Sequence, residues 1–373
     1  MKKSLVIFTL ILVLFSFGAN AEAPIYSSAD LFSDRDLQQS ADLSEAVQYT
    51  VSDGQDIHIA DEGVYVLSGT AAGVTVYVEA GDDDKVQLVL DGVSITNSSA
   101  PAICADTADK VFVTTSADSA LTVTGAMDEK TDGAIFSRVD LVLNGTATLT
   151  VTSTANGIVC KDDLKITGGA WAVTASVKAI DANDSIRIAG GALTLTAGSD
   201  GLHAENSDDD TQGYIFISAG DIAINAGDDG VHATSVVQID GGSLTISAAE
   251  GIEGTCIQIN GGTIDIQSRD DGINAAKKSG AYAPTVEIND GTITVVMGGG
   301  DTDGIDSNGN IIVNGGTVNV TGNSAFDFDG FAQYNGGTII VNGQQVDSIP
   351  NQMMGGRGGF GGFGGGRGGR GGW

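Results

Sequence analysis

The sequence predicts an all-β fold, a three-sided parallel β-helix of about ten coils of 21–23 residues each. The first observation behind this prediction is a small residue followed by an aliphatic or aromatic one, a pattern that returns ten times. Its members are Ala102-Ile103, Ala134-Ile135, Gly157-Ile158, Ala179-Ile180, Gly201-Leu202, Gly230-Val231, Gly251-Ile252, Gly272-Ile273, Gly304-Ile305 and Ala325-Phe326. The intervals are 32, 23, 22, 22, 29, 21, 21, 32 and 21 residues. The three longer intervals indicate insertions into a basic period of 21–23 residues.

The second observation is the internal pattern of one unit, CIQINGGTIDIQSRDDGINA (256–275). It holds three short β-type runs, Ile257–Ile259, Thr263–Ile266 and Gly272–Ala275, in which apolar and polar residues alternate. Glycines separate the runs, and glycine permits the backbone conformations of tight corners. Three strands in each period of about 21 residues predict three sides, and stacking at about 4.8 Å gives a rod of roughly 45 Å.

The third observation is a column of inward residues that repeats from coil to coil. Its members are Trp171, Leu193, Leu244, Ile264, Ile293, Val318 and Ile339. We therefore expect Trp171 in the core rather than on the surface as a platform for sugars. The three cysteines, Cys104, Cys160 and Cys256, fall in apolar stretches, and we expect them to be small core residues.

The two ends lack the repeat. Lys2 and Lys3 precede an apolar run, and Ala19-Asn20-Ala21 follows it, which is typical of a secretory signal peptide cut near Ala21. We expect a signal peptide over 1–21, a cap region over 22–60, the β-helix over 61–347 and a disordered glycine- and arginine-rich tail over 348–373. The protein is then secreted, without a membrane span, and its tail is a candidate tether to the cell surface or matrix.

The charge of the chain excludes some partners. The formal net charge is −31, and removal of two lysines with the signal peptide leaves 15 − 48 = −33. Such a surface repels nucleic acid and anionic lipid and attracts cations.

Two acidic columns form the candidate metal site. Two carboxylates about 5 Å apart repel by roughly 3–4 kcal/mol at an effective dielectric of 20, which favours a divalent ion between the coils. Hard oxygen ligands at glycine corners suit Ca²⁺. The alternatives are a softer ion such as Zn²⁺ at His203 and His232, bonds from these histidines to neighbouring acids, and a solvated acidic face. The candidate metal ligands are Asp200, Asp228, Asp229, Glu250, Glu253, Asp270, Asp271, Asp303 and Asp306.

Other side chains are candidates for glycan contact. Lys165, Arg187 and Phe216 are equivalent outward positions in three adjacent coils, and Tyr214 and Tyr282 lie in or beside insertions. Lys178 interrupts the acidic column one coil before Asp200. A base beside Ca²⁺ is the arrangement that β-elimination of an acidic polysaccharide uses, which makes Lys178 and Arg187 weak catalytic candidates. A salt bridge between Lys178 and Asp200, and surface solubility for the other basic and aromatic residues, are the alternative roles.

The repeated SDGLHA, DDGVHA, DDGINA and TDGIDS units, each followed by a GG corner, resemble a secreted bacterial carbohydrate-binding β-helix family. The resemblance covers roughly residues 50–345, and that family is similar in fold to polysaccharide lyases. It implies a right-handed parallel β-helix with bound Ca²⁺ and plant-cell-wall ligands such as cellulose and polygalacturonate (pectin). It also implies Asp200, Asp229, Asp271 and Asp303 as calcium-side residues. The first coils, with PAIC and NGIVC, lack the acid of the motif.

The leading functional hypothesis is a secreted, calcium-binding protein that binds polysaccharide, with Ca²⁺ between protein and uronate carboxylates. We expect a binding protein rather than an enzyme. The alternatives are a calcium-dependent polysaccharide lyase and a structural protein of the cell surface or matrix.

Overall fold

The computed structural model describes residues 24–299 and 302–351. Its regular structure is almost entirely β-strand, and the strands pair in parallel with a single antiparallel exception among the named strand pairs. The all-β prediction is therefore confirmed. The helix α1 (Ser28–Leu31) has four residues, and no helix in the described part of the chain is long and apolar enough to cross a membrane. The expected signal peptide and the tail beyond residue 351 lie outside the described residues.

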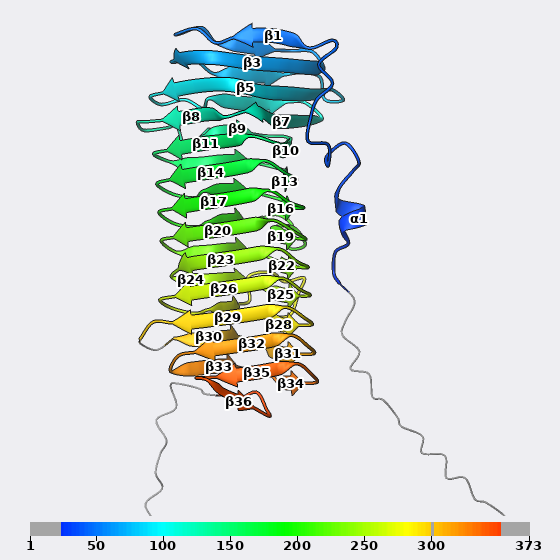
Figure 1. Cartoon of the computed structure of the whole chain (residues 1–373), viewed down its shortest axis with the longest axis vertical. Helices are drawn as coiled ribbons and strands as arrows, with labels where there is room; N and C mark the ends of the chain where they lie inside the picture. The colour runs from blue at the N-terminus through cyan, green and yellow to red at the C-terminus, as the bar shows by residue number, and fades with distance from the viewer. Residues whose placement is uncertain (1–23, 300–301, 352–373) are drawn as a thin grey trace, which may run out of the picture.

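The chain visits three stacks of strands in turn (Figure 1). The first stack is β1 (Val47–Thr50), β3 (Gly63–Ala72), β5 (Lys85–Asn97), β7 (Lys110–Ala117), β10 (Asp140–Gly145), β13 (Asp163–Ile166), β16 (Ser185–Ile188), β19 (Tyr214–Ile217), β22 (Val236–Ile239), β25 (Cys256–Ile259), β28 (Thr285–Ile288), β31 (Asn310–Val313) and β34 (Ala332–Tyr334). The second stack continues from β3 and β5 as β8 (Ser119–Val123), β11 (Thr148–Ser153), β14 (Ala170–Ala175), β17 (Ala192–Ala197), β20 (Asp221–Ala226), β23 (Ser243–Ala248), β26 (Thr263–Ser268), β29 (Thr292–Met297), β32 (Thr317–Thr321), β35 (Thr338–Val341) and β36 (Gln344–Val346).

The third stack is separate from the other two. It is β2 (Ile57–Ile59), β4 (Val76–Glu79), β6 (Ile103–Thr107), β9 (Gly133–Ser137), β12 (Asn156–Cys160), β15 (Ile180–Ala182), β18 (Leu202–Ala204), β21 (Asp229–Ala233), β24 (Glu250–Gly254), β27 (Ile273–Ala275), β30 (Asp303–Ser307) and β33 (Ser324–Phe328). Among the described residues it forms a sheet of 12 strands, whereas the first two stacks share β3 and β5 and form one sheet of 24 strands.

Alternation along the strands buries one face of each stack. In β17, β20 and β26 buried and exposed residues alternate without interruption, and the buried ones meet in one core shared by the three stacks. Trp171 is only 1% exposed and pairs in register with Leu193, so its predicted core position is confirmed. Cys104 and Cys160 are buried as expected, but Cys256 is half-buried, because it faces outward beneath other side chains.

Glycine is required at two recurrent places. The second glycine of each GG corner has a positive φ, as at Gly262 with 91°, a region that side chains with a Cβ rarely adopt. The glycine of each acidic-glycine pair fills a different need. A Cβ on Gly230 would lie 2.3 Å from Ile246 Cγ2 and 2.6 Å from the carbonyl oxygen of Gly251 in the next turn. A side chain at Gly230 would therefore force the neighbouring turns to shift apart.

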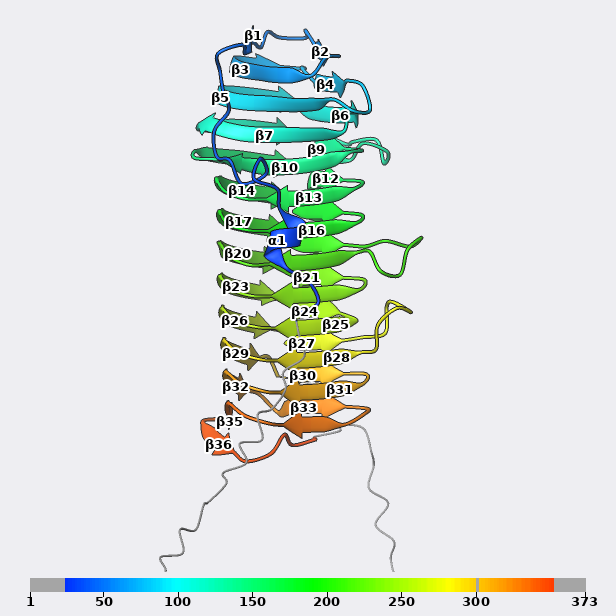
Figure 2. The same cartoon turned by 90° about the vertical axis from the view of Figure 1, so that its right-hand side faces the viewer.

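Residues 24–39, which we call the N-terminal strap, run along the outer side of the first stack (Figures 1 and 2). The backbone of Tyr26 exchanges two hydrogen bonds with the side-chain amide of Gln238, at 2.7 and 2.9 Å. Farther along, Asp36 binds Lys165 Nζ at 3.0 Å. The region expected as a cap over 22–60 contains β1 and β2, which form the first turn of the stacks, and the strap, which lies beside the first stack.

The last strand changes direction. Asn342, with a φ of 51°, and Gly343 turn the chain so that β36 pairs antiparallel with β35. An antiparallel final strand covers an edge that would otherwise offer unpaired backbone groups to another chain.

Candidate functional site

The two acidic columns expected from the sequence are brought into register along the third stack. The outer row is formed by residues that pair directly from strand to strand, namely Asp181, His203, His232, Glu253, Asn274, Asp306 and Asp327. The second row lies three residues earlier in each turn, and within it Asp229 pairs with Glu250. The stacking of the rows is confirmed, whereas metal binding by them stays a prediction.

One part of these rows, which we call the histidine segment, contains Lys178, Asp181, Asp200, His203, Asp229, His232, Glu253 and Lys278. The rings of His203 and His232 stack with centroids 4.7 Å apart. His203 Nδ1 lies 2.8 Å from Asp181 Oδ1, and Lys178 Nζ lies 3.1 Å from the same oxygen. Asp200 is buried, with its Oδ2 3.8 Å from His203 Nε2.

His232 joins two carboxylates. Its Nδ1 lies 2.6 Å from Asp229 Oδ2 and 3.0 Å from Glu253 Oε2, and Lys278 Nζ binds Glu253 at 2.9 Å. Burial acts to lower the pKa of His232, but the hydrogen bonds and charges of Asp229 and Glu253 outweigh it and raise the pKa to about 9. For the acid Glu253 burial acts in the opposite direction and raises the pKa, but the hydrogen bonds and charges of His232 and Lys278 outweigh it and lower the pKa to about 2. The histidine segment therefore holds its own positive charges at neutral pH.

The carboxylate segment, Glu250, Asp271, Asn274, Asp303, Asp306 and Asp327, is electrostatically different. Burial raises the pKa of Asp306 to about 7, reinforced by the charges of Asp271, Asp303 and Asp327. Burial also raises the pKa of Glu250 to about 7, against a 3.1 Å hydrogen bond from Asn274 Nδ2. The Oδ1 of Asn274 is buried and accepts no hydrogen bond within the described residues.

Two predicted metal ligands lie apart from these contacts. Asp228 and Asp270 are exposed on the turns before the rows. Asp229, His232 and Glu253 do offer three ligand atoms within 4.8 Å of one another, but the His232 proton already bridges the two carboxylates. A cation there would have to displace a bound positive charge.

The candidates for glycan contact lie beneath the N-terminal strap. Phe216 is fully buried against Phe32, with ring centroids 6.3 Å apart. Tyr214 stacks on Tyr26 at 4.3 Å, and Tyr282 packs against the same cluster.

The two basic members of this row are paired. Lys165 binds Asp36, which is buried and also lies 3.5 Å from Lys110 Nζ. Arg187 binds Asp163 and lies over the ring of Tyr214. In this structure the chain itself therefore occupies the row of Lys165, Arg187 and Phe216. Lys178, the other catalytic candidate, is held by Asp181 and by the His203 ring, 2.9 Å from its Nδ1.

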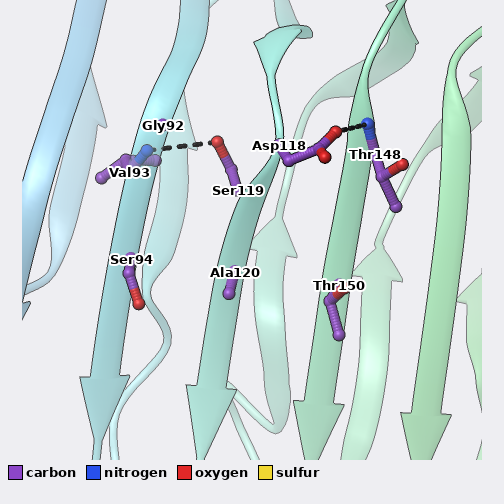
Figure 3. Close-up of a pocket in the computed structure, with 8 residues that line it drawn as sticks. All are labelled: Gly92, Val93, Ser94, Asp118, Ser119, Ala120, Thr148 and Thr150. Atoms are coloured by element: carbon purple, nitrogen blue, oxygen red, sulfur yellow. Dashed lines mark hydrogen bonds between the residues drawn. The ribbon is translucent and has the colours of Figure 1, made fainter.

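A hollow of about 330 Å³ lies on the outer face of the second stack (Figure 3). Two of its polar side chains are already hydrogen-bonded to the backbone of neighbouring strands. Ser119 Oγ accepts a 3.2 Å hydrogen bond from Val93 N, and Asp118 Oδ1 accepts one of 3.0 Å from Thr148 N. Figure 3 shows small side chains, Ser94, Ala120 and Thr150, farther along the same three adjacent strands. This hollow follows from small residues on a flat sheet.

Comparison with known proteins agrees with the family expected from the sequence. A family model described as carbohydrate-binding domain-containing protein matches residues 53–256 and 252–348. A carbohydrate-binding domain-containing protein of Acetivibrio thermocellus is 35% identical over 124 residues, which are 31% of this chain and 43% of that relative. The match therefore spans less than half of that relative. A solved polysaccharide lyase-like protein from C. thermocellum, in a gadolinium derivative, is 31% identical with a TM-score of 0.54, covering 57% of this chain and 96% of the other.

Proposed function

The chain belongs to the family of carbohydrate-binding domain-containing proteins, and on that premise we propose that it is a secreted protein that binds polysaccharide with the help of Ca²⁺. We also propose that its three stacks close around the shared core as a right-handed three-sided β-helix. The in-register parallel pairing in each stack and the single core between them support that architecture.

The carboxylate segment is the proposed calcium site. The observation that carries the proposal is the position of Asp306 among Asp271, Asp303 and Asp327. Burial, reinforced by the charges of these three acids, raises the pKa of Asp306 to about 7. Unit charges of like sign about 5 Å apart repel by about 3 kcal/mol at an effective dielectric of 20, and a divalent ion would turn that repulsion into attraction. The donor set fits Ca²⁺, because it consists of carboxylate oxygens together with the amide oxygen of Asn274.

The residues that would hold the ion are Glu250, Asp271, Asn274, Asp303 and Asp306. The predicted ligands of the histidine segment, Asp200, Asp229 and Glu253, are less suited, because His232 and Lys278 already supply positive charge there. When bound, Ca²⁺ would supply a positive centre for a carboxylate ligand on an otherwise anionic surface.

The proposed ligand is an acidic polysaccharide of the pectin type. A chain of formal net charge −31 repels a polyuronate unless cations lie between the two. Calcium on the carboxylate segment would provide that link. The tail is the proposed tether to the cell surface or matrix.

A lyase is the second candidate function, and the position of Lys178 beside the acidic rows favours it. Its Nζ lies 3.1 Å from Asp181 Oδ1, so its ammonium group would first have to give up a proton before the amine could accept one from the sugar. Incubation with polygalacturonate and Ca²⁺ should then give the ultraviolet absorbance of an unsaturated uronate, and Lys178→Met should abolish it. We expect binding without this product.

The test of the binding proposal is a pull-down on insoluble polygalacturonate and on cellulose, each with Ca²⁺ and with EDTA. We expect retention on polygalacturonate in Ca²⁺ and release by EDTA. Asp306→Asn should reduce retention, whereas Asp270→Asn, at an exposed acid of a neighbouring turn, should not. Equal retention in Ca²⁺ and EDTA would refute the calcium link, and no retention on either polymer would favour a purely structural protein.

A further inference from the structure

Two loops stand beside each other on one side of the molecule, and neither takes part in the proposed calcium site. One connects β18 to β19 and the other connects β27 to β28, and both project beyond the strands (Figure 2). Ser279 Oγ donates a 2.6 Å hydrogen bond to the carbonyl oxygen of Asp210, and the amide of Gly280 donates to Asp210 Oδ2 at 3.2 Å. The two insertions are therefore joined to each other.

Each loop is also fixed to the stack beneath it. The amides of Lys278 and Ser279 donate to Thr255 Oγ1 at 3.0 and 2.8 Å. In the other loop, Asn206 Nδ2 donates to Asp184 Oδ1 at 2.7 Å. The walls that the loops form are thus held in place before any ligand arrives, which reduces the entropy lost on binding.

A cavity of about 300 Å³ lies between these loops and the strands. Its lining residues are His203, Glu205, Asn206, Ser207, Asp210, His232, Thr234 and Lys278. This volume is at the lower end of the range for small-molecule sites, which is roughly 300–1,000 Å³. It suits one or two sugar rings rather than a long stretch of polymer.

The lining contains both hydrogen-bond donors and acceptors. Lys278 and the imidazoles donate, Glu205 and Asp210 accept, and the hydroxyl groups of Ser207 and Thr234 do both. Neighbouring hydroxyls of a pyranose each donate and accept, so a sugar can use both kinds of group at once. Glu205 Oε2 lies 3.5 Å from His203 Nε2, and the Glu205 side chain is 61% exposed, so that most of it can still reach a ligand.

The charges of the site favour a neutral sugar. Lys278 is already bound to Glu253 at 2.9 Å, and His232 to Asp229 and Glu253. The carboxylates of Glu205 and Asp210 line the cavity itself. A uronate would bring a further negative charge against these groups without an unpaired cation to receive it.

We propose that this cavity binds a single neutral sugar residue, at a chain end or a side branch of a polysaccharide, without calcium. The recess at the base of two loops admits a terminal unit more readily than the middle of a chain. The inference rests on the proposed carbohydrate-binding function but not on its calcium site.

The test is a titration of the full chain, in EDTA, with methyl glycosides of glucose, galactose, xylose and arabinose, and separately with galacturonate. We expect one or more neutral glycosides to bind with a Kd of about 1 mM, as the small size of the ligand allows. Glu205→Gln and Lys278→Met should each weaken that binding about tenfold. The neighbouring exposed residues provide matched controls, and Asp208→Asn and Lys277→Met should change nothing.

Three results would overturn the inference. They are no binding of any neutral glycoside, binding that neither Glu205→Gln nor Lys278→Met weakens, and tighter binding of galacturonate than of the neutral sugars. Thermal melting of each variant distinguishes a lost contact from a lost fold. The polygalacturonate pull-down in Ca²⁺ uses a different ligand and a different segment, so either proposal can fail while the other holds.

Discussion

The histidine segment and the carboxylate segment are consecutive parts of the same stacked rows, yet the negative charge of the first is balanced by cationic side chains and that of the second is not. In the first, His232, Lys178 and Lys278 lie within 3.1 Å of carboxylate oxygens. In the second, burial raises the pKa of Asp306 to about 7, and the charges that act on it, those of other acids, raise it further rather than offset the burial. The comparison shows that an acidic motif repeated in sequence does not have one function throughout. Cationic residues in the two rows and in an inserted loop decide whether the negative charge of a turn is balanced from within.

Removal of His232 should make the histidine segment resemble the carboxylate segment, with negative charges that the chain itself does not balance. His232→Ala leaves Asp229 and Glu253 buried without their shared cation, and we expect a loss of about 3 kcal/mol in the free energy of unfolding. Urea unfolding measures the loss. His58→Ala is the matched control, because His58 pairs with Glu79 on the surface, with its side chain 58% exposed, and should change stability little. Added Ca²⁺ should restore part of the stability of His232→Ala, and failure to do so would contradict the view that only charge separates the two segments.

The decrease in the free energy of unfolding at alkaline pH should depend on the same residue, His232. The pKa of His232 is about 9 in the fold and 6.5 for an ordinary histidine. Its protonated form is therefore favoured by folding, and the contribution is complete below pH 6.5 and is lost as pH rises through about 9. The loss is about 3 kcal/mol at most, since each pKa unit is worth about 1.4 kcal/mol. Unfolding of the wild type and of His232→Ala between pH 6 and 10 measures it, and equal slopes for the two proteins would contradict the assignment.

The carboxylate segment should respond in the opposite range. Asp306 and Glu250 have a pKa of about 7 in the fold, against 3.8 and 4.5 for ordinary residues. Well below pH 4 both carboxyl groups are protonated in the folded and in the unfolded protein. As pH rises from there, the free-energy cost of charging them in the fold grows, and it is complete above about pH 7. In EDTA we expect the protein to gain about 2 kcal/mol between pH 8 and pH 5, after allowance for solvent screening. Thermal melts in EDTA and in Ca²⁺ test this, and a gain of the same size in both buffers would argue against an ion at this segment.

The sequence was sufficient for the part of the fold that repeats. Spacing of 21–23 residues and alternation within the runs predicted the stacked strands, the core position of Trp171 and the register of the acidic rows. These features are local or recur at a constant interval, so that one coil predicts the next.

The remaining features depend on contacts between distant parts of the chain. The strap was missed because residues 24–39 carry no repeat, and their partners Lys165, Phe216 and Gln238 lie more than 100 residues away. In the histidine segment, bonds from His203 and His232 to neighbouring acids were one of the alternatives open from the sequence, but the contribution of Lys278 was missed for a similar reason. Lys278 comes from an insertion, and no spacing rule indicates that its ammonium group reaches Glu253.

The central claim is that a cation binds the carboxylate segment and not the histidine segment. The most direct measurement is a calorimetric titration of Ca²⁺ into the wild type, Asp306→Asn and Asp270→Asn. We predict binding by the wild type and by Asp270→Asn, and affinity weakened at least about tenfold in Asp306→Asn, which corresponds to about 1.4 kcal/mol. An absence of heat in the wild type, or identical affinities in all three proteins, would contradict the account.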